Sequence, residues 1–90
     1  MAALIYRPHA KVVAMRIRYA NEHKLRIQMA RRGWTERQIV EALQTQGIAV
    51  HGKRGPATRY VHPGTGRSVV VDDATGEVFH VGGDGFEYHD

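Results

Sequence analysis

The sequence predicts an α+β fold in which N-terminal helices pack on a small antiparallel sheet of about four strands. Three observations support this prediction. Up to residue 46 the chain is rich in helix formers and carries helix-boundary signals. From residue 48 the apolar residues recur with a period of two, which is typical of strands, and the links between the predicted strands are too short for crossover helices. Residues 1–90 are predicted to form a single domain.

The first part of the chain is predicted to be helical, with a break. Pro8 suits a helix start, because the amide N–H that it lacks would have no partner there. Residues 9–32 are mostly good helix formers, yet their apolar positions do not form one continuous stripe. We therefore expect a break near Asn21 and describe residues 1–24 as a helical N-terminal extension of a core that spans residues 25–81.

The second helical piece is predicted to end at Gly33. Leu25 and Met29 are four residues apart, so they face the core together. Gly33 readily adopts the left-handed conformation that closes many helices. Arg31 and Arg32 lie just before it, where cations interact favourably with the helix dipole.

The clearest local signal is a short helix after Thr35. Thr35 and Gln38 form a capping-box pattern, and Trp34 and Ile39 flank it as a hydrophobic staple. Gly47 is predicted to terminate this helix. Its predicted buried face consists of Ile39, Val40 and Leu43.

Four strands are predicted after this helix. They are Ile48 to Val50, Ala57 to Val61, Ser68 to Val71 and Glu77 to Val81. The expected links are a Gly-containing loop over residues 51–56 and turns over residues 62–66 and 73–76. Residues 82–90 form a Gly-containing acidic tail.

Charge is unevenly distributed along the chain. Residues 1–37 carry nine basic and two acidic side chains, residues 38–71 carry four basic and one acidic, and residues 72–90 carry six acidic and no basic ones. A basic body of this kind is typical of proteins that bind a polyanion such as nucleic acid. A solvated cationic surface without a partner is the simpler alternative.

The composition and motifs exclude several classes of protein. The chain has no cysteine, which excludes disulfides, cysteine-based zinc sites and thiol catalysis. No apolar run is long enough to span a bilayer. The sequence also lacks a phosphate-binding Gly-rich loop, a His-x-x-x-His pair and a Gly-x-Ser-x-Gly motif. Asp72, Asp73 and Glu77 bracket a predicted turn, where carboxylates mostly face solvent, so we predict no metal site and no cofactor.

The remaining polar candidates are basic and imidazole side chains, which suffice for metal-independent RNA cleavage. In that reaction the 2′-hydroxyl attacks the adjacent phosphate. It requires a proton acceptor, cations at the non-bridging oxygens and a proton donor for the leaving 5′-oxygen. Histidine can take either proton role. The candidates are His51, Lys53, Arg54, Arg59, His62 and His80, with Arg31 and Arg32 upstream.

Several of these candidates have simpler interpretations. His51 and Lys53 are equally consistent with solvent-exposed phosphate contacts. Trp34 is either a core residue that completes the staple or a surface on which bases stack. Arg59 and Tyr60 alternate across a predicted strand, so only one of them can face a substrate. For His80 the simpler interpretation is an ordinary sheet residue.

Four phrases in a fixed order carry a family resemblance. They are Arg-Gly-Trp-Thr-Glu at 32–36, Lys-Arg at 53–54, Pro-Ala-Thr-x-Tyr at 56–60 and Val-Val-Val-Asp-Asp-x-Thr-Gly-Glu-Val at 69–78. Over residues 25–81 the chain resembles the tRNA-cleaving ribonuclease domain of the E-five-type colicins and related contact-dependent growth-inhibition toxins.

The resemblance implies a fold of the barnase–EndoU–colicin–RelE kind and a metal-independent endoribonuclease. Such an enzyme cuts tRNA in the anticodon loop and leaves a 2′,3′-cyclic phosphate. The resemblance further implies a bacteriocin-like toxin that acts in the cytoplasm of another bacterium, delivered as the C-terminal domain of a larger protein. It also implies an acidic immunity protein or antitoxin as the partner.

The resemblance places catalysis largely on arginine and lysine side chains. Lys53 and Arg54 match the family's loop, and Arg32 matches its basic residue before Gly-Trp. Two departures concern substrate recognition. Gly55 alone separates Lys53-Arg54 from the following proline, where colicin domains have a longer insertion. After the last strand the family continues with basic and aromatic residues, whereas this chain ends in Asp84, Glu87 and Asp90.

We therefore expect a ribonuclease in which His51 and His62 are additions that supply a proton acceptor and donor. The expected catalytic residues are Lys53, Arg54, His51 and His62. The expected substrate-binding residues are Arg31, Arg32, Trp34, Thr58, Arg59 and Tyr60. The alternatives are a non-catalytic RNA-binding module and the toxin of a chromosomal toxin–antitoxin pair that acts on other RNA.

Overall fold

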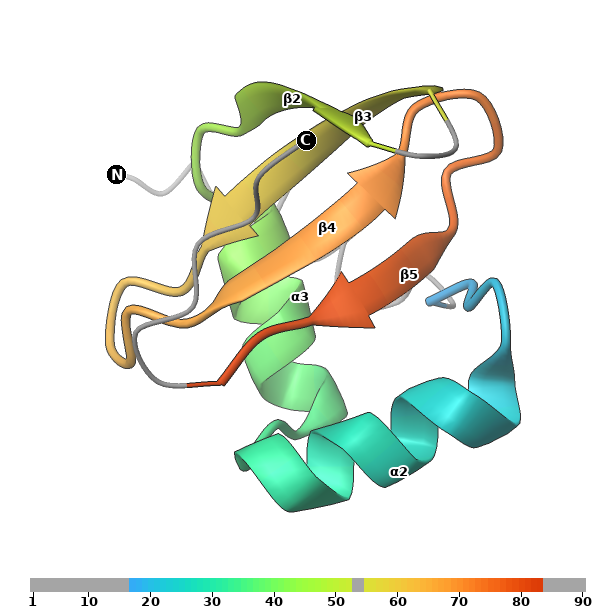
Figure 1. Cartoon of the computed structure of the whole chain (residues 1–90). Coiled ribbons are helices and arrows are strands. Elements are labelled where there is room, and N and C mark those ends of the chain that lie inside the picture. Colours follow the sequence, from blue (N-terminus) through green and yellow to red (C-terminus); the bar gives the residue numbers. More distant parts are fainter. Residues whose placement is uncertain (1–16, 53–54, 84–90) are drawn as a thin grey trace.

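The computed structural model describes residues 17–52 and 55–83. Its elements are the helices α2 (Glu22–Arg32) and α3 (Glu36–Leu43) and the strands β2 (Ile48–Gly52), β3 (Gly55–Val61), β4 (Ser68–Asp72) and β5 (Val78–Val81). The strands form one antiparallel sheet in the order of the chain. Figure 1 shows α3 behind this sheet and α2 beneath β5. The predicted α+β class, with helices packed on a four-stranded antiparallel sheet, is confirmed.

The break predicted near Asn21 is the start of α2. The Asn21 side chain accepts a hydrogen bond from the Lys24 amide at 3.0 Å, as an N-cap residue does. The segment before it is not helical, because Tyr19 forms a parallel bridge with Val78 of β5. The predicted helical extension is therefore wrong at residues 17–20, whose backbone bonds to a strand instead. Residues 1–16 lie outside the described residues.

The predicted boundary between the two helices is confirmed. Gly33 closes α2 in the left-handed conformation, with φ of 75°, and its amide donates to the carbonyl of Met29. Thr35 and Gln38 form both hydrogen bonds of the capping box at the start of α3. Trp34 and Ile39 are both buried in one apolar cluster, as a hydrophobic staple requires.

Helix α3 ends at Leu43, before the predicted terminator Gly47. The amide and the hydroxyl of Thr45 both bond to the carbonyl of Ala42, which closes the helix early. Gly47 is required for another reason, because a Cβ atom there would lie 2.3 Å from Cγ2 of Thr58. Its lack of a side chain allows the chain leaving α3 to pass close to β3.

The core lies between the two helices and one face of the sheet. Its buried members are Leu25, Met29, Trp34, Ile39, Ala42, Val69, Val78 and Val81. Ala42 was not among the predicted core residues, whereas Val40 and Leu43 are only half-buried. Because α3 is short and packs on β3 and β4, the narrow stripe formed by Ile39 and Ala42 points directly at the sheet.

The first hairpin is longer than predicted. His51 pairs with Pro56 and Gly52 pairs with Gly55, so most of the predicted loop over residues 51–56 is strand. Residues 53–54, which join these two paired ends, lie outside the described residues. In the other strands, β4 continues to Asp72 and β5 begins one residue later than predicted.

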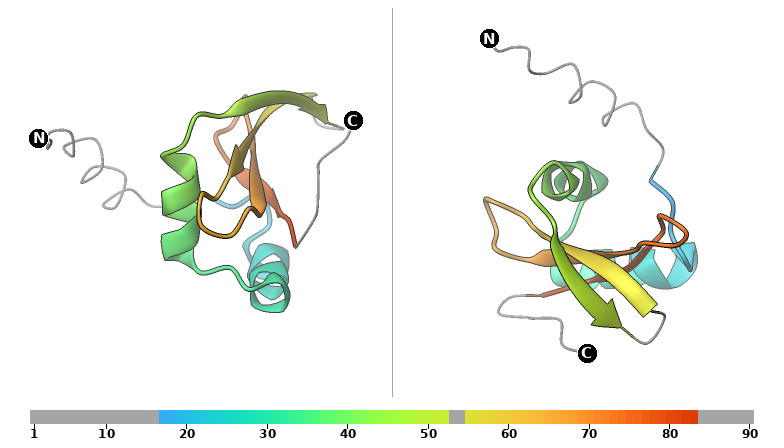
Figure 2. Two further views of the ribbon diagram at one scale, coloured as in Figure 1. Left: turned by 90° about the vertical axis from the view of Figure 1, so that its left-hand side faces the viewer. Right: turned by 90° about the horizontal axis from the view of Figure 1, so that it is seen from above.

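The two faces of the sheet differ in what covers them. Tyr60 and Val69 are paired across β3 and β4 and pack in the helical core. Arg59 and Val70, one position along, therefore point to the opposite face. Figure 2 shows α3 on one side of the sheet only. We call the side of Arg59 and Val70 the outer face.

Candidate nucleic-acid interface

Arg59 is the predicted binding residue that the fold directs to the outer face. It stands opposite Val70 in the register, and its Nη1 donates to the hydroxyl of Ser68 at 3.0 Å. Ser68 is fully buried, so the guanidinium group is fixed over β4 by a neutral group. This hydrogen bond orients the positive charge without neutralising it, an arrangement that suits contact with a phosphate.

The side chains of Thr58 and Tyr60 point to the helical side of β3, opposite the outer face. The hydroxyl of Thr58 donates to the Asp73 carboxylate at 2.7 Å, and Tyr60 packs against the helical core. The sequence-based statement that only one of Arg59 and Tyr60 can face a substrate is consistent with this alternation. Of the predicted binding residues on this strand, Arg59 alone remains a candidate.

Trp34 is a core residue. Only 5% of its surface is exposed, and its indole N–H donates to the carbonyl of Gly82 at 2.8 Å. A buried ring with a satisfied N–H offers no face on which a base can stack. Of the two interpretations of Trp34, the structure supports the core staple, and the assignment as a substrate-binding residue is corrected on this ground.

His62 is also buried and has a structural environment. Its exposed fraction is 7%, and the edge of its ring meets Trp34 with 6.2 Å between centroids. Nδ1 accepts the amides of Gly64 and Thr65 at 2.9 and 3.1 Å, so the ring proton is on Nε2, which lies 2.7 Å from the Glu41 carboxylate. With both nitrogens engaged, His62 has no atom left to exchange a proton with a substrate, and we correct its assignment as a catalytic residue.

The other predicted catalytic residues belong to the end of the β2–β3 hairpin. His51 is exposed near the end of β2, one residue before the terminal Gly52–Gly55 pair. Lys53 and Arg54 lie outside the described residues, and the sequence places them between the two glycines. His51 is thus the candidate proton carrier that the structure leaves accessible.

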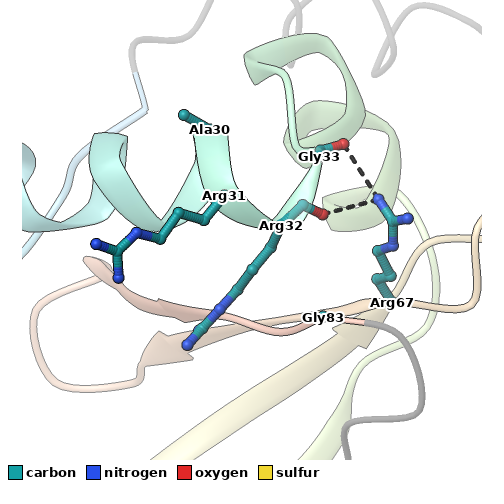
Figure 3. A pocket seen from close by; sticks show the side chains of 6 residues that line it. All are labelled: Ala30, Arg31, Arg32, Gly33, Arg67 and Gly83. Atoms are coloured by element: carbon teal, nitrogen blue, oxygen red, sulfur yellow. Dashed lines mark hydrogen bonds between the residues drawn. The ribbon is translucent and has the colours of Figure 1, made fainter.

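A second group of cations gathers at the opposite end of the sheet, around the C-terminal end of α2. A depression of about 350 Å³ is lined by Ala30, Arg31, Arg32, Gly33, Arg67 and Gly83, and we call it the arginine pocket (Figure 3). Arg32 donates from Nη1 to the carbonyl of Val81 at 2.7 Å. Arg67 donates from Nη1 to the carbonyls of Arg32 and Gly33 at 2.8 and 3.2 Å. Arg31 and Arg32 were predicted from the sequence, whereas Arg67 was not.

Two arginines of the helices are paired with carboxylates. Arg26 contacts Glu22 at 3.0 Å and Glu36 at 2.8 Å, and Arg37 contacts Glu41 at 3.4 Å. These pairs lie on the helices and are exposed. Arg32 and Arg59 donate instead to a backbone carbonyl and to a hydroxyl group, so their charge is well suited to bind a polyanion.

His80 stands opposite Val70 on β5 and is half-buried. Burial lowers the pKa of its imidazole, and the positive charges of Arg32 and Lys24 lower it further. Its ring is therefore mostly neutral at pH 7 and adds little charge to the interface. A half-buried position in the sheet agrees with the simpler interpretation of this residue.

The described residues contain no group of three or more histidine and carboxylate side chains that could hold a metal ion. Among the helices of residues 17–52 and 55–83, none is long and apolar enough to cross a membrane. Comparison with family models, curated proteins and solved structures finds no match to this chain.

Two residues of the interface had no signal in the sequence. Arg67 follows a turn and precedes a strand, and nothing nearby in the chain indicates that it reaches the end of α2, 34 positions away. Ser68 looks like the first residue of an ordinary strand, yet it holds Arg59. Both roles depend on contacts between distant segments, which local patterns do not report.

Proposed function

We propose that this chain is a ribonuclease domain that binds the RNA backbone through Arg59 and the arginine pocket and cleaves RNA without a metal ion. The observation that carries the proposal is the way its arginines are held. Arg32 is oriented by a backbone carbonyl and Arg59 by a hydroxyl group. Such bonds limit the freedom of the side chains while preserving the charge that a phosphate needs.

The proposed chemistry is an internal displacement at phosphorus. The 2′-oxygen loses its proton to an acceptor and bonds to the phosphorus atom, while the bond to the 5′-oxygen breaks and that oxygen receives a proton. The products are a 2′,3′-cyclic phosphate and a 5′-hydroxyl. We assign charge stabilisation to Lys53 and Arg54 and proton transfer to the exposed His51, since His62 is buried.

The proposed substrate is tRNA, and the proposed setting is that of a bacterial toxin with an acidic immunity protein or antitoxin. Both proposals rest on the resemblance of residues 25–81 to colicin-type ribonuclease domains. The arginines support only the broader part, which is recognition of a polyanionic backbone. An acidic partner would complement the same cationic surface that binds RNA.

The test is incubation with total bacterial tRNA in the presence of EDTA, followed by a denaturing gel and mapping of the cut ends. We expect discrete fragments from the wild-type protein and none from a variant carrying both Lys53→Ala and Arg54→Ala. The matched control is Arg37→Ala, which removes an exposed cation from α3 that pairs with Glu41. Full cleavage by the double variant would refute the assignment of Lys53 and Arg54.

A non-catalytic RNA-binding module is the second candidate function. It is favoured by the burial of His62, which leaves one accessible histidine of the expected pair. The same gel separates the two functions. Intact tRNA at high protein concentration, together with salt-dependent binding in a titration, would support the module and exclude the ribonuclease.

A further inference from the structure

We propose that the arginine pocket binds one phosphate group of the RNA backbone that is several nucleotides away from the cleaved bond. This inference rests on the proposed function and adds a second anchoring point for the same RNA. It involves Arg67, which no sequence motif identified, and it places the point at the end of the sheet opposite the β2–β3 hairpin.

The lining of the pocket fits an anion. Among its described lining residues, three are arginines and none carries a carboxylate. Figure 3 shows Arg32 running from the end of α2 toward β5, while Arg67 rises from the β3–β4 connection to the end of α2. Arg31 is exposed on the same helix end. A volume of about 350 Å³ leaves ample room for a phosphate group and its water.

The arginines of the pocket are fixed before any ligand arrives. Arg32 is attached to the carbonyl of Val81, and Arg67 is attached to two carbonyls at the end of α2. A guanidinium group has five N–H donors, and the bond of Arg32 to Val81 uses a single nitrogen, Nη1. Arg32 therefore keeps donors that can bind a phosphate in the two-point manner typical of arginine.

The position of Arg67 also removes an electrostatic obstacle. The C-terminal end of a helix carries partial negative charge, which by itself would repel a phosphate. Arg67 covers the carbonyls of Arg32 and Gly33 at this end. The contact requires glycine at position 33, because a Cβ atom there would lie 2.6 Å from Nη1 of Arg67. Gly33 thus serves both the helix end and the pocket.

The proposed phosphate site and the cleavage site lie at opposite ends of β3, so the length of this strand sets the distance between them. Strand β3 runs from Gly55 at the hairpin end to Val61, and the next residue, His62, bonds to the backbone of Arg67. Six steps from Gly55 to Val61 at ~3.3 Å per residue give roughly 20 Å. Arg59 lies between the two ends on β3. An RNA strand that touches both ends must therefore extend over several nucleotides.

The first test is the salt dependence of RNA binding. The probe is a fluorescent single-stranded RNA with methylated 2′-hydroxyls, which cannot be cleaved by internal attack. Each phosphate contact contributes about 0.7 to the slope of log K against log salt for a single strand. We expect Arg67→Gln to lower this slope by about that amount. Arg37→Gln, which removes an exposed cation of α3, should leave the slope at its wild-type value.

A second variant controls for destabilisation of the fold, because the side chain at position 67 also covers the carbonyl groups at the end of α2. Arg31→Gln removes an exposed charge from the pocket lining, and no hydrogen bond of the Arg31 side chain would be lost in the described structure. Thermal melts establish that each variant is folded at the assay temperature. A wild-type slope in both Arg67→Gln and Arg31→Gln would overturn the proposal.

The second test varies the length of a cleavable RNA. For long substrates we expect Arg31→Gln to lower kcat/KM, and for substrates too short to reach from the hairpin to the pocket we expect no difference from wild type. An equal reduction at every length would overturn the remote location. If the protein binds RNA with the predicted change of slope but cleaves none of it, the pocket is supported and the ribonuclease proposal fails.

Discussion

Replacement of His62 distinguishes a structural histidine from a catalytic one. In His62→Ala three hydrogen bonds are lost, to the amides of Gly64 and Thr65 and to the carboxylate of Glu41. At about 1 kcal/mol each, they amount to roughly 3 kcal/mol. Loss of the edge contact with the Trp34 ring adds about 0.5–1.5 kcal/mol. The melting temperature should fall by more than about 10 °C, since 1 kcal/mol shifts a domain of this size by about 4–8 °C.

His62→Asn is the matched variant. Its side-chain oxygen can still accept the two turn amides in place of Nδ1, while the bond to Glu41 is lost. We expect a loss of about 1 kcal/mol, or about 4–8 °C, measured by circular dichroism and by the fluorescence of Trp34. Equal losses for the alanine and asparagine variants would refute this account of the turn.

The same variants test the role of His62 in RNA cleavage. Because both ring nitrogens are engaged within the protein, His62→Asn should cleave RNA at the wild-type rate at a temperature where both proteins are folded. A stable but inactive His62→Asn protein would return His62 to the catalytic residues and contradict the structural assignment.

The pair of His62 and Glu41 also predicts a pH dependence of stability. The hydrogen bond from His62 lowers the pKa of the Glu41 carboxyl below its ordinary value. A carboxyl whose pKa is lowered by folding stabilises the protein above its unfolded-state pKa, and this contribution is lost as the pH falls through the folded-state pKa. The stability advantage of wild type over His62→Asn should therefore be present at pH 7 and shrink below about pH 4 in urea titrations.

Two further perturbations test the fold and the charge of the interface. Gly47→Ala should lower the free energy of unfolding by about 1–3 kcal/mol, because the added methyl group would overlap Thr58. Urea titrations measure this loss. A variant as stable as wild type would show that the chain can shift at this position. Neutralising the carboxylates that follow Gly83 in the sequence, with Asp84→Asn, Glu87→Gln and Asp90→Asn together, should tighten RNA binding in low salt. The effect should be smaller in high salt, because the change acts by removing three negative charges from a chain with a net charge of +4. Identical affinities for wild type and the triple variant in low salt would contradict the second expectation.

The sequence predicts much of this fold because its decisive signals are local. The capping box spans four residues from Thr35 to Gln38, and Gly33 closes the preceding helix through its own backbone conformation. The change to a period of two predicts the sheet, and the alternation of Arg59 and Tyr60 separates the two sides of a strand. The errors at strand ends arise where pairing with another segment extends a strand, as at His51.

The candidate site depended on contacts that only the tertiary structure provides. His62 looks like an accessible catalytic histidine in the chain, yet Glu41, 21 positions earlier, and Trp34 enclose it. Arg67 has no local signal, yet it joins the end of a helix 34 positions earlier. The sequence by itself determined the helices, the strands and the basic character. Packing decided which polar groups remain on the surface, because burial depends on neighbours far apart in the chain.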